Sequence, residues 1–163
     1  MKLLTFGMRN TKEILRDPLT IIFSLGFPII LILLLSAIQM NIPVSLFEIE
    51  HLTPGITVFG LSFETLFAAT LISKDRESAF LQRLYTTPLT AIDFILGYTL
   101  PILPIAVGQS IICYIVAILL GLPITITILY AIAFILPISL FFVALGLLCG
   151  SIFNVKQVGG ICG

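Results

Sequence analysis

The chain has 163 residues, of which 59% are hydrophobic and 10% are charged, and its formal net charge at pH 7 is zero. Soluble globular domains carry about a quarter charged residues. The composition therefore excludes a soluble fold and indicates an all-α protein that crosses a membrane several times.

The first seventeen residues predict an amphipathic helix in the membrane interface. At about 100° per residue, most apolar side chains fall on one side and the charges on the other. The apolar side holds Leu3, Leu4, Gly7, Met8, Thr11, Ile14 and Leu15, and the charged side holds Lys2, Arg9, Lys12, Glu13 and Arg16. Phe6 lies off the apolar side. We expect this helix, residues 1–17, to rest with its apolar side in lipid and to end at Asp17, before Pro18. The alternative is a polar leader whose periodicity is accidental.

Four apolar stretches follow, and their lengths predict four transmembrane helices. We expect one transmembrane domain over residues 1–163, with spans at 19–40, 56–73, 95–120 and 124–153. Pro54 and Gly55 mark the start of the second span. A capping-box pattern from Thr90 to Asp93 opens the third helix, and Gly121 begins the turn that precedes the fourth span. The tail at 157–163 resembles the beginning of a further span.

The basic residues gather in three places, and this predicts the orientation of the chain. They lie before the first span, in a polar segment between the second and third spans, and after the fourth span: Lys2, Arg9, Lys12 and Arg16; Lys74, Arg76 and Arg83; and Lys156. The first connection instead carries Glu48, Glu50 and His51. By the positive-inside rule, we expect a multi-pass protein of the cell membrane whose N-terminus and polar segment are cytoplasmic.

The polar segment at 74–88 predicts a short amphipathic helix. One arc holds Phe80, Leu81, Leu84 and Tyr85, and the opposite arc holds Asp75, Arg76, Gln82 and Arg83. Glu77 falls on the apolar arc, where a carboxylate is favoured if a helix N-terminus lies nearby and otherwise needs a partner. Such a helix is suited to docking a cytoplasmic protein. A short helix that lies on the bilayer is the alternative.

The same segment resembles a known sequence signature. Residues 76–88 read Arg-Glu-Ser-Ala-Phe-Leu-Gln-Arg-Leu-Tyr-Thr-Thr-Pro, which is similar to the R-E-x-G-T-L-x-x-L-x-x-T-P signature of type-2 ABC exporter permeases. The matching positions are Arg76, Glu77, Leu81, Leu84, Thr87 and Pro88. Ala79 replaces the usual Gly, and Phe80 replaces the usual Thr. Further similarity at Arg16-Asp17-Pro18, at Pro54-Gly55 and from Ile95 to Pro101 extends the resemblance over the whole chain.

The resemblance implies an architecture of six spans, with an interfacial helix first and a coupling helix between spans two and three that docks on the ATP-binding subunit. The chain resembles about two-thirds of such a permease, so we expect it to be C-terminally truncated and to lack spans five and six. On this resemblance the docking residues are Arg76, Glu77, Phe80, Leu81, Arg83 and Leu84.

The implied function is that of the membrane subunit of an ABC exporter, which moves a drug-, lipid- or polysaccharide-like substrate out of the cytoplasm by alternating access. Its partners are a cytoplasmic ABC ATPase, which binds the ATP, and a second, identical or different, permease subunit. The chain itself is expected to have no catalytic site, cofactor, metal or nucleic-acid partner. The alternative is a non-transporting immunity or sensor protein, or an inactive fragment, that binds a partner through residues 74–88.

Three further features leave alternatives open. Glu64 lies in the middle of its span, where a charge is costly, so it either lines the translocation path or is protonated and bonded to a hydroxyl such as that of Ser62. Gly146 and Gly150 form a GxxxG motif that permits close packing, either within the chain or between two chains. The cysteines Cys113, Cys149 and Cys162 have no disulfide or zinc spacing, and the one histidine predicts no metal site.

Overall fold

A computed structural model describes residues 2–41, 48–78, 80, 82, 86 and 90–162. The regular elements in these residues are helices: α1 (Lys2–Arg16), α2 (Pro18–Ile21), the π-helical turn η1 (Ile22–Gly26), α3 (Phe27–Asn41), α4 (Ile49–Glu77), α6 (Ala91–Leu119), α7 (Ile126–Ile152) and α8 (Val155–Ile161). No strand occurs in this part of the chain. The predicted all-α fold class is confirmed.

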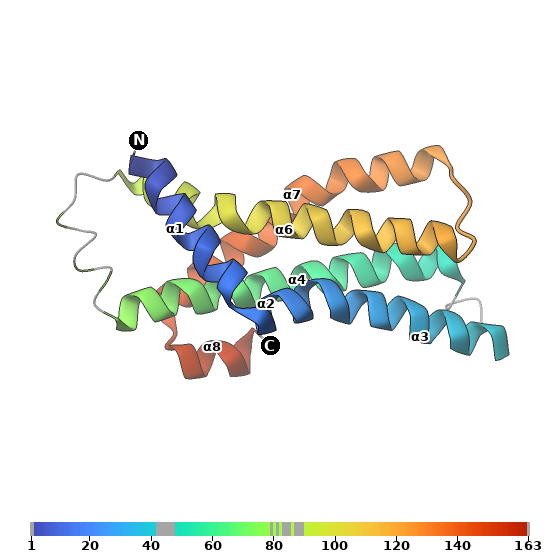
Figure 1. Cartoon of the computed structure of the whole chain (residues 1–163), viewed down its shortest axis with the longest axis horizontal. Helices are drawn as coiled ribbons and strands as arrows, with labels where there is room; N and C mark the ends of the chain where they lie inside the picture. Colours follow the sequence, from blue (N-terminus) through green and yellow to red (C-terminus); the bar gives the residue numbers. More distant parts are fainter. Residues whose placement is uncertain are drawn as a thin grey trace.

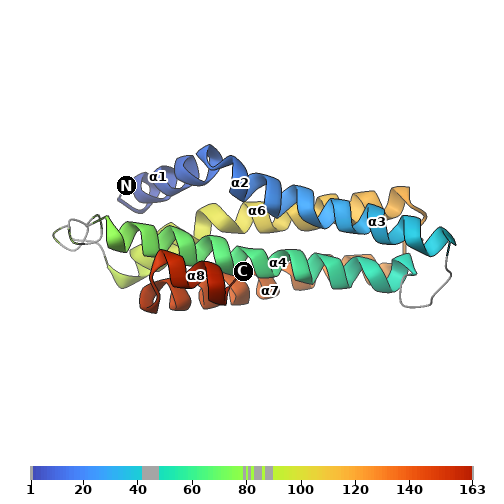
Figure 2. The same ribbon diagram turned by 90° about the horizontal axis from the view of Figure 1, so that it is seen from below.

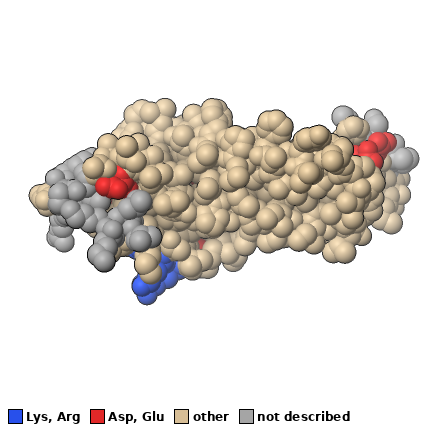
Figure 3. Space-filling model, turned by 90° about the horizontal axis from the view of Figure 1, so that it is seen from above, with Lys and Arg blue, Asp and Glu red and all other residues tan. Residues whose placement is uncertain are grey.

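Within the described residues, four helical stretches are long and apolar enough to cross a membrane. They are Ile22–Asn41, Ile49–Glu77, Ala91–Leu119 and Ile126–Ile152. Figures 1 and 2 show them running lengthwise beside one another, with α1 crossing the bundle at one end and α8 beside α4 near that end. Among the described residues on the face in Figure 3, nearly all of the surface is uncharged, and most of the acidic and basic groups lie toward the ends.

The start of α4 differs from the expected start of the second span. The acidic patch was expected in the connection, but Glu50 and His51 lie in the first turn of α4, and Pro54 is inside the helix. A proline close to a helix start removes only one backbone hydrogen bond, that to the carbonyl of Glu50, so the helix can begin before it. At its other end, α4 continues through Glu77. The first residues of the predicted coupling segment therefore extend α4.

Local sequence signals at other helix ends are confirmed. Asp17 separates α1 from α2. Thr90 caps α6 and makes the predicted capping box with Asp93, so α6 begins at Ala91. Gly121 has a φ of 108°, the left-handed region that glycine enters without strain, in the turn between α6 and α7.

The tail forms a short helix where a further span was expected to begin. Helix α8 has seven residues, and Gln157 Oε1 accepts the backbone N–H of Asn154, its N-cap residue, at 3.1 Å. Val158 is fully buried, and α8 packs against α4. The apolar residues of α8 are thus partly covered by the chain itself.

The most extensive helix contact joins α4 to α7, and two glycines allow it. A Cβ atom at Gly146 would lie 2.5 Å from the backbone oxygen of Thr65 and 2.7 Å from Cβ of Ala68. A Cβ atom at Gly150 would lie 2.5 Å from the backbone oxygen of Ala69. The GxxxG motif is therefore occupied by packing within the chain, where small residues let two backbones approach closely.

This packing predicts that Gly146→Ala destabilises the bundle. We expect the added methyl group to lower the free energy of unfolding by about 1–3 kcal/mol, the usual cost of overpacking. Gly108→Ala on α6 is the matched control, because no heavy atom lies within 4 Å of its added Cβ. Denaturant unfolding in detergent measures both, and equal stabilities of the two variants would contradict the close contact.

Candidate functional site

A bidentate ion pair joins α1 to the end of α4. Arg9 donates from Nη1 to Asp75 Oδ2 at 2.5 Å and from Nη2 to Asp75 Oδ1 at 2.6 Å. Tyr98 of α6 donates its hydroxyl to Asp75 Oδ2 at 2.7 Å. The Asp75 side chain is only 2% exposed, and both of its oxygens accept hydrogen bonds from the Arg9 guanidinium or the Tyr98 hydroxyl. We call Arg9, Asp75 and Tyr98 the three-helix junction.

The Arg9 guanidinium makes further contacts around this junction. Glu13, one turn along α1, lies 2.9 Å from Nη2, and the guanidinium carbon lies 4.1 Å from the centre of the Phe80 ring. This second contact has cation–π geometry. The hydrogen bond to Asp75 raises the pKa of Arg9 above its ordinary value, so this cation stays charged in any physiological buffer.

Aromatic packing continues the contact between α1 and α6. The Phe6 ring meets the Tyr98 ring edge-on, with centroids 5.0 Å apart, and it fills the space left by the absent side chain of Gly97. One turn further, Asn10 Nδ2 donates to the backbone oxygen of Gly97 at 2.9 Å. Ile14 is also buried. Helix α1 therefore packs on the bundle through one i, i+4, i+8 row of side chains.

The buried row differs from the predicted apolar side. Phe6 was expected to be misplaced and is instead buried, whereas Met8 and Leu15, on the predicted side, are 61% and 60% exposed in the structure. The reason is that α1 has two apolar environments. One side meets α6, and the other, which includes Met8 and Leu15, stays outside the protein. A helical wheel cannot separate the two.

Arg76 and Glu77, the first residues of the signature, contact the chain where α7 ends and α8 begins. Arg76 donates to the backbone oxygens of Ser151 and Phe153 and to Asn154 Oδ1, the last two at 2.8 and 3.1 Å. Carbonyls at a helix C-terminus have no partner in their own helix, and a cation is favoured there. Glu77 Oε1 accepts the N–H of Val155 at 3.0 Å, in the first turn of α8. Each charge therefore faces the helix end that it stabilises.

The other predicted docking residues are described only in part. Leu81, Arg83 and Leu84 lie outside the described residues. Phe80 is half-buried beneath Arg9 and packs against the cluster around Phe6. Docking by these residues stays a prediction, and two of the motif residues have intrachain partners already.

Glu64 has a hydroxyl partner from another helix. Ser24 of η1 donates to Glu64 Oε1 at 3.0 Å, and Glu64 is 1% exposed. The hydroxyl of Ser62 instead donates to the backbone oxygen of Phe59 at 2.6 Å. Pro28 has no N–H for the carbonyl of Ser24 one turn earlier, and the π-helical turn lies at this point. The irregular backbone thus carries the hydroxyl that bonds the intramembrane carboxyl.

A second buried polar side chain, the amide of Gln109, has no hydrogen-bond partner among the described residues. Gln109 of α6 is fully buried, and neither Nε2 nor Oε1 makes a hydrogen bond. Its side chain lies against Gly60 of α4, close to Pro28 of α3. Buried polar groups are nearly always hydrogen-bonded, so this amide is a costly feature in the middle of the bundle.

Sequence reasoning missed Asp75, Arg9 and Tyr98 as partners. A helical wheel over residues 74–88 alone predicts Asp75 on the polar arc of a separate short helix. Continuing the buried row of α4, which includes Ala68, Leu71 and Ile72, places Asp75 on the buried side instead. This signal was present in the sequence. Nothing local in the sequence connects Arg9 to a residue 66 positions away.

Four helices long enough to cross a membrane form one bundle, and the ion pair of Arg9 with Asp75 holds α1 across one end of it. This architecture is that of a multi-pass α-helical membrane protein. The family model of the ABC-2 type transporter matches residues 1–163, and the chain belongs to this family. It is therefore an ABC-2 type permease component. No curated protein and no solved structure matches the chain.

The three-helix junction predicts that Arg9→Gln is destabilising. Removal of the cation leaves the Asp75 carboxylate buried with Tyr98 as its remaining donor, and we expect a loss of about 2–4 kcal/mol in the free energy of unfolding. Arg9→Lys should lose less, because it keeps the charge without the bidentate geometry. Unfolding in uncharged detergent measures the loss. Lys12→Gln, an exposed position on the same helix, is the control, and an equal effect there would disprove the role of the pair.

The Ser24–Glu64 bond is testable by a double-mutant cycle. Ser24→Ala and Glu64→Leu should be non-additive in unfolding free energy, with a coupling of about 1 kcal/mol, because leucine has no oxygen to accept the Ser24 hydroxyl. Ser62→Ala with Glu64→Leu is the matched cycle. It should be additive, because the Ser62 hydroxyl bonds its own helix. Coupling of Glu64 to Ser62, without coupling of Glu64 to Ser24, would show that Ser62 is the hydrogen-bond partner of Glu64.

Proposed function

We propose that the chain is the membrane subunit of an ATP-driven ABC exporter, that it pairs with a second permease subunit, and that a separate cytoplasmic ATPase binds and hydrolyses the ATP. Family membership over residues 1–163 supports the transporter class. The observation that carries the coupling proposal is the three-helix junction. Its carboxylate, Asp75, directly precedes the signature residues 76–88, at the point where α4 ends.

The junction gives a physical route from a docked ATPase to the spans. A displacement of residues 78–90 acts on the end of α4 and on the start of α6. Asp75 and Tyr98 join these two ends, and Arg9 adds α1 to them. Arg76 and Glu77 extend the same connection to α7 and α8. Movement of this segment would therefore be transmitted to α1, α4, α6, α7 and α8 together.

The charges at the two ends of the bundle support the orientation in this proposal. Lys12, Arg16 and Lys74 lie at the end with α1, whereas Glu48 and Glu50 lie where α4 begins, at the opposite end. Basic residues next to membrane spans favour the cytoplasmic side. The ATPase would accordingly meet the end that carries the signature segment.

Glu64 and Gln109 are our candidates for polar contacts on the translocation path. Both are buried near the middle of membrane-length helices, and the Gln109 amide has no partner among the described residues. Polar groups at such depth are expensive and usually functional. A mainly apolar bundle with a few such groups suits an amphipathic drug- or lipid-like substrate better than a polysaccharide, which is hydrophilic throughout.

The docking proposal predicts that Leu84→Asp weakens binding of the ATPase. A charge placed on the apolar arc of residues 74–88 should lower both co-purification of the co-expressed ABC ATPase and substrate-stimulated ATP hydrolysis, by tenfold or more if it removes about 1.4 kcal/mol of docking energy. Ile124→Asp is the matched control, because Ile124 is an exposed apolar residue in the turn at the other end of the bundle.

Two outcomes would argue against the proposal. Normal co-purification and coupled export by Leu84→Asp would remove the docking role from this segment. Equal loss in Ile124→Asp would show that an added charge acts through stability and not through docking.

A further inference from the structure

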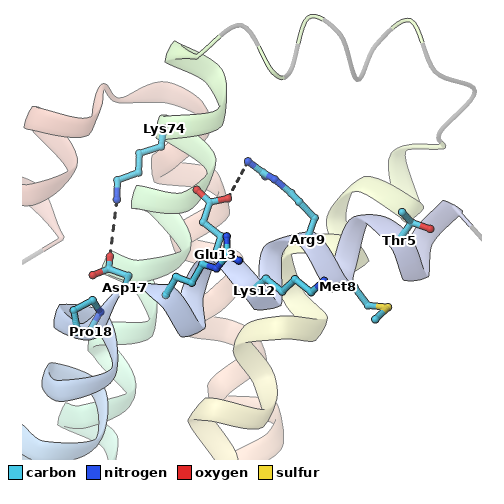
Figure 4. Close-up of a pocket in the computed structure, with 9 residues that line it drawn as sticks. Thr5, Met8, Arg9, Lys12, Glu13, Asp17, Pro18 and Lys74 are labelled. Atoms are coloured by element: carbon cyan, nitrogen blue, oxygen red, sulfur yellow. Dashed lines mark ion pairs between the residues drawn. The ribbon is translucent and has the colours of Figure 1, made fainter.

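A groove of about 970 Å³ lies between α1 and the end of α4, beside the three-helix junction (Figure 4). Its charged lining consists of four cations and two carboxylates: Arg9, Lys12, Arg16, Lys74, Glu13 and Asp17. In Figure 4, Lys74 extends from α4 toward Asp17 at the end of α1. The groove therefore carries an excess of positive charge.

Ion pairs compensate only part of this charge. Arg9 is bonded to Asp75 and to Glu13, and Lys74 Nζ lies 4.0 Å from Asp17 Oδ2 while half-exposed. Lys12 and Arg16 are exposed and take part in none of the salt bridges found within the described residues. They are four residues apart on α1, so their side chains extend from the same side of the helix.

The surroundings of the groove indicate what kind of anion fits. Pro18, which lines it, is the first residue of the helical stretch that enters the first span. Met8, also in the lining, is 61% exposed, and Leu15 on the same helix is 60% exposed. An interfacial helix lies with its exposed apolar residues among acyl chains and its cations at the level of the headgroups. Cations and apolar side chains therefore meet at one place on the membrane surface.

We propose that this groove binds an anionic phospholipid. Lys12 and Arg16 contact the headgroup phosphate, with Arg16 able to donate two parallel hydrogen bonds, and Lys74 adds a third positive charge from α4. Met8 contacts the upper part of an acyl chain. A lipid in this position touches α1 and α4 together, next to the Arg9–Asp75 pair. The site needs neither the ATPase nor a particular direction of transport.

Spin-labelled lipids test the proposal directly. The purified full chain is reconstituted in phosphatidylcholine vesicles that contain acyl-chain spin-labelled phosphatidylglycerol or phosphatidylcholine, and electron paramagnetic resonance measures the relative association of the two probes. We expect a preference for phosphatidylglycerol. Lys12→Gln with Arg16→Gln should reduce this preference by about fivefold for each charge removed.

Two controls keep the result specific. Lys156→Gln removes one exposed charge at the first turn of α8, outside the groove, and should leave the preference unchanged. The swap Lys12→Arg with Arg16→Lys keeps both charges and should retain the preference, which separates loss of charge from misfolding. Helix content by circular dichroism should be equal in all variants.

The same measurement distinguishes a lipid from a soluble anion. Millimolar inorganic phosphate should leave the bound phosphatidylglycerol in place, because it offers no acyl chains to Met8. Displacement by free phosphate would overturn the lipid as the occupant. Loss of the preference in Lys156→Gln, or its persistence in the double Gln variant, would show that surface charge in general, and not this groove, attracts the lipid.

Discussion

The buried carboxylate of Asp75 constrains everything around it. Removing a carboxylate from water costs several kcal/mol unless its charge and both oxygens are matched. Arg9 supplies the charge and two donors, and Tyr98 supplies the third hydrogen bond. Helix α1 cannot leave the bundle without stranding this carboxylate. The position of α1 then brings Phe6 against Tyr98 and into the space at Gly97. The ion pair therefore fixes which side of α1 packs against Tyr98 and which side, with Met8 and Leu15, stays exposed.

The last four residues of α4 extend this principle to the whole end of the bundle. Lys74 approaches Asp17 after α1, Asp75 binds α1 and α6, Arg76 binds the end of α7, and Glu77 binds the start of α8. Successive side chains on a helix are about 100° apart, so four in a row point to every side. The polar residues 74–77 were predicted to begin a separate short helix, but they extend α4 and contact each neighbouring element. The first two residues of the signature, Arg76 and Glu77, therefore serve the permease's own architecture.

The sequence predicted what depends on local chemistry. The four spans followed from apolar length, the start of α6 from the Thr90–Asp93 capping box, and the turn at Gly121 from its glycine. It did not predict what depends on the meeting of distant residues. Periodicity assigned α1 an apolar side but could not say that the row through Phe6 meets α6. Ser62 was a natural partner for Glu64 by proximity in the chain, yet the π-helical turn presents Ser24. Because α4 continues through Glu77, Asp75 lies on the buried side of α4 and Glu77 meets the first turn of α8.

The two sides of α4 differ in a way that bears on how the bundle can move. Toward α7, glycines bring the backbones close enough that a single added methyl group would overlap Thr65 or Ala69. Toward the first span, α4 meets a π-helical turn, the Ser24–Glu64 hydrogen bond and the amide of Gln109, which has no partner among the described residues. Close-packed contacts between backbones have few alternative arrangements, whereas an irregular helix and an unsatisfied amide can find new partners after a small shift. A displacement of α4 would therefore carry α7 with it, and relative motion would concentrate between α4 and the first span. The buried polar groups Glu64 and Gln109 lie at that boundary, which fits the translocation path proposed above.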